Sequence, residues 1–170
     1  MDKIEFMVLG LPRSSTTWIS NWLTTDTTTC LHDPVWKYHY TEFNKIKTSK
    51  RLGVACTGLF RFPEWVNAHP AKKVIIHRDL GDINISMMKQ GLPFLTKVDE
   101  EKLWSIQGFH VTQEDLFTGC PKLIYEYLLE ISFDAERFEL LRHLNVQNDN
   151  TNTTINIETL VRFDKELGAI

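Results

Sequence analysis

The most informative part of the sequence is residues 6–18, which read Phe-Met-Val-Leu-Gly-Leu-Pro-Arg-Ser-Ser-Thr-Thr-Trp. The four apolar residues at its start are typical of a short buried strand. A turn follows, and the run of small hydroxyl residues behind it suits the start of a helix, where the first backbone N–H groups lack internal partners. The stretch therefore predicts a strand, a turn and a helix in direct succession.

The turn also has the properties of an anion site. The free N–H groups and the dipole of a helix start both favour negative charge, and Arg13 adds a permanent cation that can bind phosphate or sulfate. The alternative is an ordinary strand–helix corner capped by Ser14 or Ser15. Capping needs one hydroxyl residue, whereas this turn has an arginine followed by four hydroxyl residues. We therefore expect an anion to bind here.

Two common nucleotide-binding patterns are absent from the sequence. The triphosphate loop G-x-x-x-x-G-K-[ST] would need glycine and lysine where this chain has Ser15 and Thr16. The dinucleotide pattern G-x-G-x-x-G is missing as well. The sequence thus disfavours an ordinary ATPase, GTPase or dinucleotide enzyme.

A second block, residues 73–86, reads Lys-Val-Ile-Ile-His-Arg-Asp-Leu-Gly-Asp-Ile-Asn-Ile-Ser. Its β-branched run predicts a buried parallel strand. Arg78 follows at the carboxyl end of that strand, where open α/β sheets bind their ligands, and Ser86 comes eight residues later in an expected helix. The alternative is that Arg78 pairs with Asp79 or Asp82 at the surface.

Together the two blocks resemble the sulfotransferases that use 3′-phosphoadenosine 5′-phosphosulfate (PAPS). The 5′-phosphosulfate loop of that family commonly reads Pro-Lys/Arg-Ser-Gly-Thr-Thr and then Trp or Leu, and its 3′-phosphate site has an arginine and a serine at the spacing of the second block. The resemblance implies these cofactor-binding residues: Pro12, Arg13, Ser14, Ser15, Thr16, Thr17, Trp18, Arg78 and Ser86. For Trp18, core packing beside Trp22 is the alternative role.

The chain departs from the family pattern in three places. Ser15 replaces a glycine, which would strain the backbone if that position needs a positive φ. Residues 122–128 are similar to a late strand of the family, with Tyr127 in place of aspartate. The late Arg-Lys-Gly element of many members does not occur in this sequence.

The resemblance implies transfer of a sulfuryl group, with no metal and no redox cofactor. Arg13 is the expected catalytic cation, because negative charge develops on the leaving phosphate oxygen. A hydroxyl or amine acceptor also needs a general base. His32 and Asp33 are the candidates, since they follow an expected strand and some family members carry an acidic base just after this point. A simple turn before Pro34 is the alternative, and the choice between the two candidates stays open.

Composition sets the broad class. The chain has 170 residues, 42% hydrophobic and 24% charged, with a net charge of −3. We expect one domain over residues 1–170 that binds neither nucleic acid nor membranes. The start has no secretory pattern, and the three cysteines are widely spaced without zinc-type pairs: Cys30, Cys56 and Cys120. These features favour a cytoplasmic protein without a metal site.

Apolar runs and helical patterns alternate along the chain. Strands are expected near 4–9, 28–31, 52–57, 72–77 and 121–126, and helices near 15–24, 38–47, 62–68, 80–89, 99–117 and 134–144. A loop at 145–156, a short strand at 154–157 and a helix from Glu158 complete the chain. The alternation predicts an α/β fold with a central parallel sheet between helical layers, and the resemblance implies the P-loop nucleoside-triphosphate-hydrolase-like type.

The sequence thus predicts a PAPS-dependent sulfotransferase that modifies a hydroxyl or amine of a small molecule, a glycan or a peptide. A small kinase-like phosphotransferase and a non-catalytic binding protein with the same fold are the alternatives. Motifs do not identify the acceptor, because specificity depends on loops and pocket shape. The oligomeric state also stays open.

Overall fold

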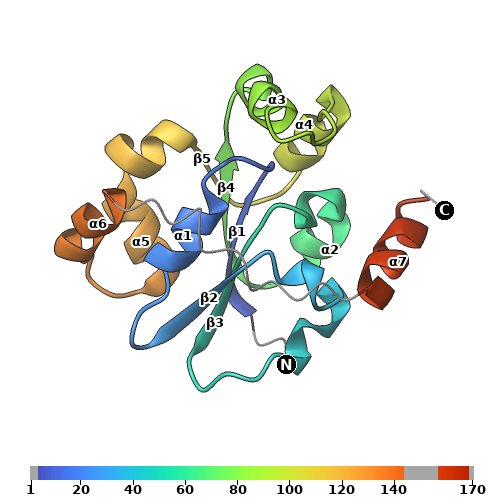
Figure 1. Cartoon of the computed structure of the whole chain (residues 1–170). Helices are drawn as coiled ribbons and strands as arrows, with labels where there is room; N and C mark the ends of the chain where they lie inside the picture. The colour runs from blue at the N-terminus through green and yellow to red at the C-terminus, as the bar shows by residue number, and fades with distance from the viewer. Residues whose placement is uncertain (1–3, 144–156, 169–170) are drawn as a thin grey trace.

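The computed structural model describes residues 4–143 and 157–168, which form an α/β fold around a five-stranded sheet (Figure 1). All four strand pairs are parallel, and the strand order is β2-β3-β1-β4-β5. The strands are β1 (Ile4–Gly10), β2 (Thr28–His32), β3 (Arg51–Cys56), β4 (Lys72–His77) and β5 (Phe109–Thr112). The predicted α/β class and parallel sheet are confirmed.

Helices cover both faces of this sheet (Figure 1). The α-helices are α1 (Thr16–Trp22), α2 (Pro63–Ala68), α3 (Leu80–Met88), α4 (Lys97–Trp104), α5 (Pro121–Leu129), α6 (Ala135–Arg142) and α7 (Ile157–Glu166). Shorter turns are the 3-10 helices η1 (Pro34–Trp36), η2 (Tyr40–Lys45) and η3 (Leu59–Arg61) and the π-helix η4 (Asp115–Gly119).

Two hydrophobic cores lie on opposite faces of the sheet, because successive strand residues point to opposite sides. Phe6 and Val8 of β1 pack into the core formed with α1, α5 and α6. Met7 and Leu9 pack into the core formed with α2, α3 and α4. The apolar run that opens the first motif therefore serves both layers, as expected of a central parallel strand.

Four of the five predicted strands and most predicted helices are confirmed, with one exchange near the end of the sheet. The expected strand at 121–126 is wrong, because those residues belong to α5. Pro121 starts that helix, and Ile124, Tyr125 and Leu128 bury one helical face. The fifth strand is instead β5, within the expected helix 99–117, of which α4 is the helical part. The expected helix at 38–47 is the 3-10 helix η2.

The expected helix from Glu158 is confirmed as α7, which begins one residue earlier. The loop expected at 145–156, and all but the last residue of the short strand expected at 154–157, lie outside the described residues. Ile157, the last residue of that expected strand, belongs to α7.

The strand register brings the loops after all five strands to one edge of the sheet. Gly10 pairs with Ile76, and His32 pairs with Ala55. The connections that leave β1 and β4 run toward opposite sides of the sheet, to β2 and β5. Neighbouring strands with diverging connections leave a crevice at their carboxyl ends, and this is where α/β proteins bind ligands.

Candidate active site

The loop between β1 and α1 has an unusual backbone. Arg13 and Ser15 have φ angles of 70° and 67°, the left-handed region that residues other than glycine rarely adopt. Ser14, between them, does not have a positive φ. Backbone that alternates in hand turns successive N–H groups toward a common hollow, which is the geometry of anion-binding nests. Ser15 therefore has the positive φ under which the sequence predicts strain.

Three contacts hold this strained loop. The guanidinium of Arg78 donates from Nη1 to the carbonyl oxygen of Arg13, at 2.7 Å. Gln113, just after β5, donates from Nε2 to Ser15 Oγ at 2.6 Å. The amide of Ile19 in α1 donates to the Ser15 carbonyl at 3.0 Å. Strands β4 and β5 and helix α1 thus fix the loop together, as strained backbone requires.

The structure brings the two sequence blocks together at Arg13. Its Nε donates to Ser86 Oγ of α3 at 3.0 Å, across 73 positions of sequence. The guanidinium of Arg78 contacts the backbone carbonyl of the same residue, Arg13. Arg13, Arg78 and Ser86 therefore form one contact network at the crevice between β1 and β4. This network places two arginine residues at one crevice, and arginine favours phosphate and sulfate groups as ligands.

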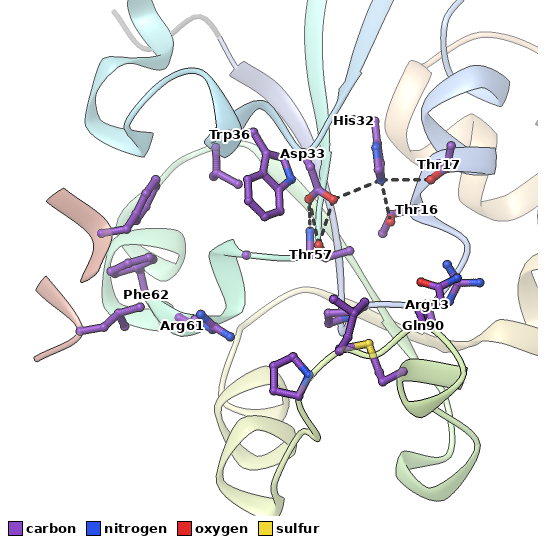
Figure 2. A pocket seen from close by; sticks show the side chains of 18 of the residues that line it. Arg13, Thr16, Thr17, His32, Asp33, Trp36, Thr57, Arg61, Phe62 and Gln90 are labelled. Atoms are coloured by element: carbon purple, nitrogen blue, oxygen red, sulfur yellow. Dashed lines mark hydrogen bonds and ion pairs between the residues drawn. The ribbon is translucent and has the colours of Figure 1, made fainter. Parts of the chain in front are cut away.

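His32 and Asp33 lie beside this loop at the end of β2. The Nε2 atom of His32 is 3.2 Å from Oγ1 of Thr16, and the same distance from Oγ1 of Thr17. It is also 3.2 Å from Oδ2 of Asp33. An ionised carboxylate only accepts, so this contact favours the His32 tautomer with its proton on Nε2. The pair thus forms a polar junction with the first turn of α1 (Figure 2).

Thr57, directly after β3, fixes the Asp33 side chain. Its amide donates to Oδ1 at 2.5 Å, and its hydroxyl lies 2.9 Å from Oδ2. Asp33 itself adopts a left-handed backbone, which aspartate tolerates better than most residues. Burial, which is the larger cause, and the negative charge of Asp33 both raise the pKa of the neighbouring Cys56 thiol. This thiol stays protonated and is not a nucleophile at neutral pH.

A cleft of about 520 Å³ opens in front of these groups (Figure 2). At one end lie the β1–α1 loop, His32, Asp33 and Thr57. Away from them the lining is mostly apolar and aromatic. It comes from η1, from η3 and the residue after it, from the end of α3 and the chain that follows, and from α7 and the residue after it: Val35, Trp36, Phe62, Met87, Leu92, Pro93, Phe163 and Leu167, with Gly58, Arg61, Gln90 and Asp164 between them. Its size and apolar lining with few polar groups suit a small organic molecule.

Most of the predicted site residues line this cleft: Pro12, Arg13, Ser15, Thr16, Thr17, His32 and Asp33. Arg78 and Ser86 are not part of the lining and reach it through Arg13. Ser14 is fully buried, and its hydroxyl has no hydrogen-bond partner among the described residues.

Trp18 lies in the core, which favours packing, the alternative role that the sequence left open. The residue is only 6% exposed, and its ring packs against those of Trp22, Phe117 and Phe138. Its indole N–H donates to the carbonyl of Leu141 at 2.9 Å. Both its apolar surface and its single donor are therefore satisfied inside the protein.

Sequence reasoning missed three parts of the site. Thr57 ends the predicted strand 52–57, so the rule that parallel strands end at one edge could have found it. Gln113 was hidden because β5 was predicted as helix. Helix α7 carries no motif, and only its folded position places Phe163 and Asp164 in the cleft.

Within residues 4–143 and 157–168, no three His, Cys, Asp or Glu side chains are grouped so that they could hold a metal ion. None of the helices in the same described residues combines the length and the apolar character needed to cross a membrane. Models of known families and curated proteins give no match to the sequence.

Proposed function

We propose that this protein is a sulfotransferase that moves a sulfuryl group from PAPS to a hydroxyl or amine acceptor. The observation that carries the proposal is the position of Arg13. It lines the cleft that holds His32 and Asp33, and it contacts both Arg78 and Ser86 of the second block. A donor with phosphate groups at both its 3′ and 5′ positions would use this concentration of cations.

In the proposed complex, the loop and both arginines bind the donor. The alternating backbone of residues 13–15 and the hydroxyls of Thr16 and Thr17 cradle the 5′-phosphosulfate. Arg78 and Ser86 bind the 3′-phosphate. Ser86 exchanges its contact with Arg13 for one with the ligand, and Arg78 uses its other guanidinium nitrogens while Nη1 keeps its bond to the Arg13 carbonyl. Arg13 is then released toward the leaving phosphate oxygen.

Transfer needs one bond to form and one to break. The acceptor oxygen or nitrogen attacks sulfur in line, and the bond from sulfur to the bridging phosphate oxygen breaks. Arg13 stabilises the charge that develops on that oxygen. The acceptor's proton passes to the pair formed by His32 and Asp33, whose side chains are in contact.

The proposed enzyme is cytoplasmic. Its three cysteines are all free thiols, and thiols persist in reducing compartments. Its acceptor is a small molecule or an exposed group of a glycan or peptide that reaches the cleft.

Ligand-dependent unfolding is the first test. A hundredfold excess of 3′,5′-bisphosphoadenosine over its Kd should stabilise the protein by about 2.7 kcal/mol, which is a rise in Tm of roughly 5–10 °C for a chain of this size. ATP with magnesium should give no comparable shift. A shift with ATP and magnesium alone would support a phosphotransferase instead.

Transfer of radiolabelled sulfate from PAPS to a panel of alcohols, phenols and amines is the second test. Turnover together with the bisphosphoadenosine shift supports the sulfotransferase. A shift without turnover on any acceptor supports a binding protein that retains the fold. Neither a shift nor turnover removes the proposal.

A further inference from the structure

Helix α7 is distant in sequence from every other part of the site, yet it forms one wall of the cleft. Phe163 and Asp164, in the helix, and Leu167, just after it, are lining residues. In Figure 1 the helix (red) lies on the α2 side of the sheet. The remaining walls come from residues 12–93, so the cleft is incomplete without this C-terminal segment.

An aromatic cluster docks α7 onto η2 and the residue before α2. The ring of Phe163 lies 4.9 Å from that of His39, 5.9 Å from that of Tyr40 and 5.5 Å from that of Phe62, centroid to centroid. Ring pairs at these separations add to the free energy gained from apolar burial. Phe163 thus has two surfaces, one on this cluster and one on the cleft.

Polar contacts from the middle and from the C-terminal end of α7 fix its position. Glu166 accepts a hydrogen bond from the Tyr40 hydroxyl at 3.0 Å, and its other oxygen lies 2.8 Å from Nε2 of His39. His39 is 1% exposed, whereas the side chain of Glu166 is partly open to solvent. Arg162 forms an ion pair with Glu42 at 3.3 Å. The helix is held in one register over η2, and its cleft residues have fixed positions.

We propose that Phe163 and Leu167 bind the apolar body of the acceptor and so determine which acceptors this protein selects. The inference rests on the proposed function, because the acceptor must lie in the same cleft as Arg13 and the pair His32–Asp33. The end of the cleft lined by Arg13, His32 and Asp33 binds the reacting hydroxyl or amine. The apolar end, between α7 and Trp36, takes the part of the acceptor that does not react.

Direct binding of 4-alkylphenols of increasing chain length tests the inference without any need for turnover. Binding is followed by tryptophan fluorescence, with Trp36→Phe to identify the reporting ring. If the chain lies against α7, each added methylene should tighten binding by about fourfold until the apolar end is filled. In Leu167→Ala and Phe163→Ala the gain per methylene should fall below twofold.

The matched control is Val161→Ala, which removes an apolar side chain from the same helix outside the cleft lining. It should keep the parent's dependence on chain length. Leu167 is 36% exposed, so its truncation tests the wall even where Phe163→Ala undocks the helix. Glu166→Gln tests the anchoring contact in the transfer assay and should raise KM for the acceptor several-fold, with kcat at saturation unchanged.

The outcomes separate the two proposals. A chain-length dependence that is identical in the parent, Leu167→Ala and Phe163→Ala overturns the role of α7, whatever the transfer assay gives. A parent that binds no alkylphenol overturns it as well. Loss of the dependence in both variants, in a parent that shows no shift with bisphosphoadenosine, supports the α7 wall and removes the sulfotransferase.

Discussion

At the scale of single residues, the β1–α1 loop combines strain with external support. A left-handed backbone costs a residue other than glycine about 1–2 kcal/mol, and Arg13 and Ser15 both adopt it. The contacts from Arg78 and Gln113 offset this cost. Strain of this kind persists where the loop must keep a shape for a ligand, because a relaxed loop would not aim its N–H groups together.

Substitutions at Ser15 measure that strain. Ser15→Gly relieves the backbone but loses the bond from Gln113 and loosens the unfolded chain, so the free energy of unfolding should change by less than about 1 kcal/mol. Ser15→Val puts a β-branched residue at a positive φ and should cost about 2 kcal/mol or more. Urea unfolding of the two variants checks this. A valine variant as stable as the parent would contradict the strained loop.

Arg13 is the residue on which the proposed chemistry depends most. Removing a group that stabilises charge only in the transition state lowers kcat by about 10²–10³. Arg13→Ala should show this loss in the sulfate-transfer assay and retain most of the parent's stability to urea. Arg142→Ala, which removes a surface arginine paired with Glu139, is the control and should keep parental turnover. Parental kcat in Arg13→Ala would remove the residue from the mechanism.

At the level of helices and strands, the sequence predicts best the strands whose apolar runs are long and buried on both faces. The strands β1 and β4 are continuous apolar runs buried on both faces, and their ends carry Arg13 and Arg78. Strand β5 has only four residues and lies at the sheet edge, so its signal is weak. Leu103 and Ile106 before it and His110 within it recur at helical spacing, and this pattern predicts a helix where the structure has β5.

The exchange of β5 and α5 also hid part of the site. With residues 121–126 taken as the last strand, Gln113 had no place at the edge where ligands bind. The position of α7 could not be predicted for a different reason. Its contacts with His39 and Tyr40 span more than 120 positions, and no local pattern encodes such a separation.

The contact of β1 with β3 depends on the absence of a side chain at Gly53. A Cβ there would overlap the ring of Phe6, which is fully buried in the α1-side core. Overpacking of this kind typically costs 1–3 kcal/mol, so Gly53→Ala should lower the free energy of unfolding by about 3 kcal/mol. Phe6→Leu should itself cost about 1 kcal/mol and make room for the alanine. Additive losses in the double variant, measured by urea unfolding, would contradict this packing.

At the scale of the whole molecule, the candidate site exists because five parallel strands end at one edge. Arg13, Asp33, Thr57, Arg78 and Gln113 each follow a different strand and are far apart in sequence. Unfolding disperses all of them at once, so ligand binding and global stability are coupled. A titrating group at this edge also changes the free energy of global unfolding. His77, the last residue of β4, is such a group.

His77 lies in a stack with Trp104 and His110, which are the ring groups that face it. Nε2 of His110 donates to the Ile106 carbonyl at 2.8 Å. The other ring nitrogen of His110, Nδ1, therefore accepts a hydrogen bond from Nε2 of His77, also at 2.8 Å. In this arrangement His77 donates the hydrogen bond between the two rings and His110 accepts it. Burial, and then the charge that His110 can carry, lower the pKa of His77 to about 4.

The stability of the protein should therefore fall on acidification between about pH 6.5 and pH 4. In this window the unfolded chain binds a proton at His77, with a pKa of about 6.5, and the native state does not, so the free energy of unfolding decreases with falling pH by at most about 1.4 kcal/mol per unit. Above pH 6.5 His77 is unprotonated in both states, so it contributes no pH dependence to the free energy of unfolding. His77→Gln should flatten the slope measured by urea unfolding at pH 7, 6 and 5, and the exposed His143→Gln should not. A parental slope in His77→Gln would show that the stack does not hold His77 neutral.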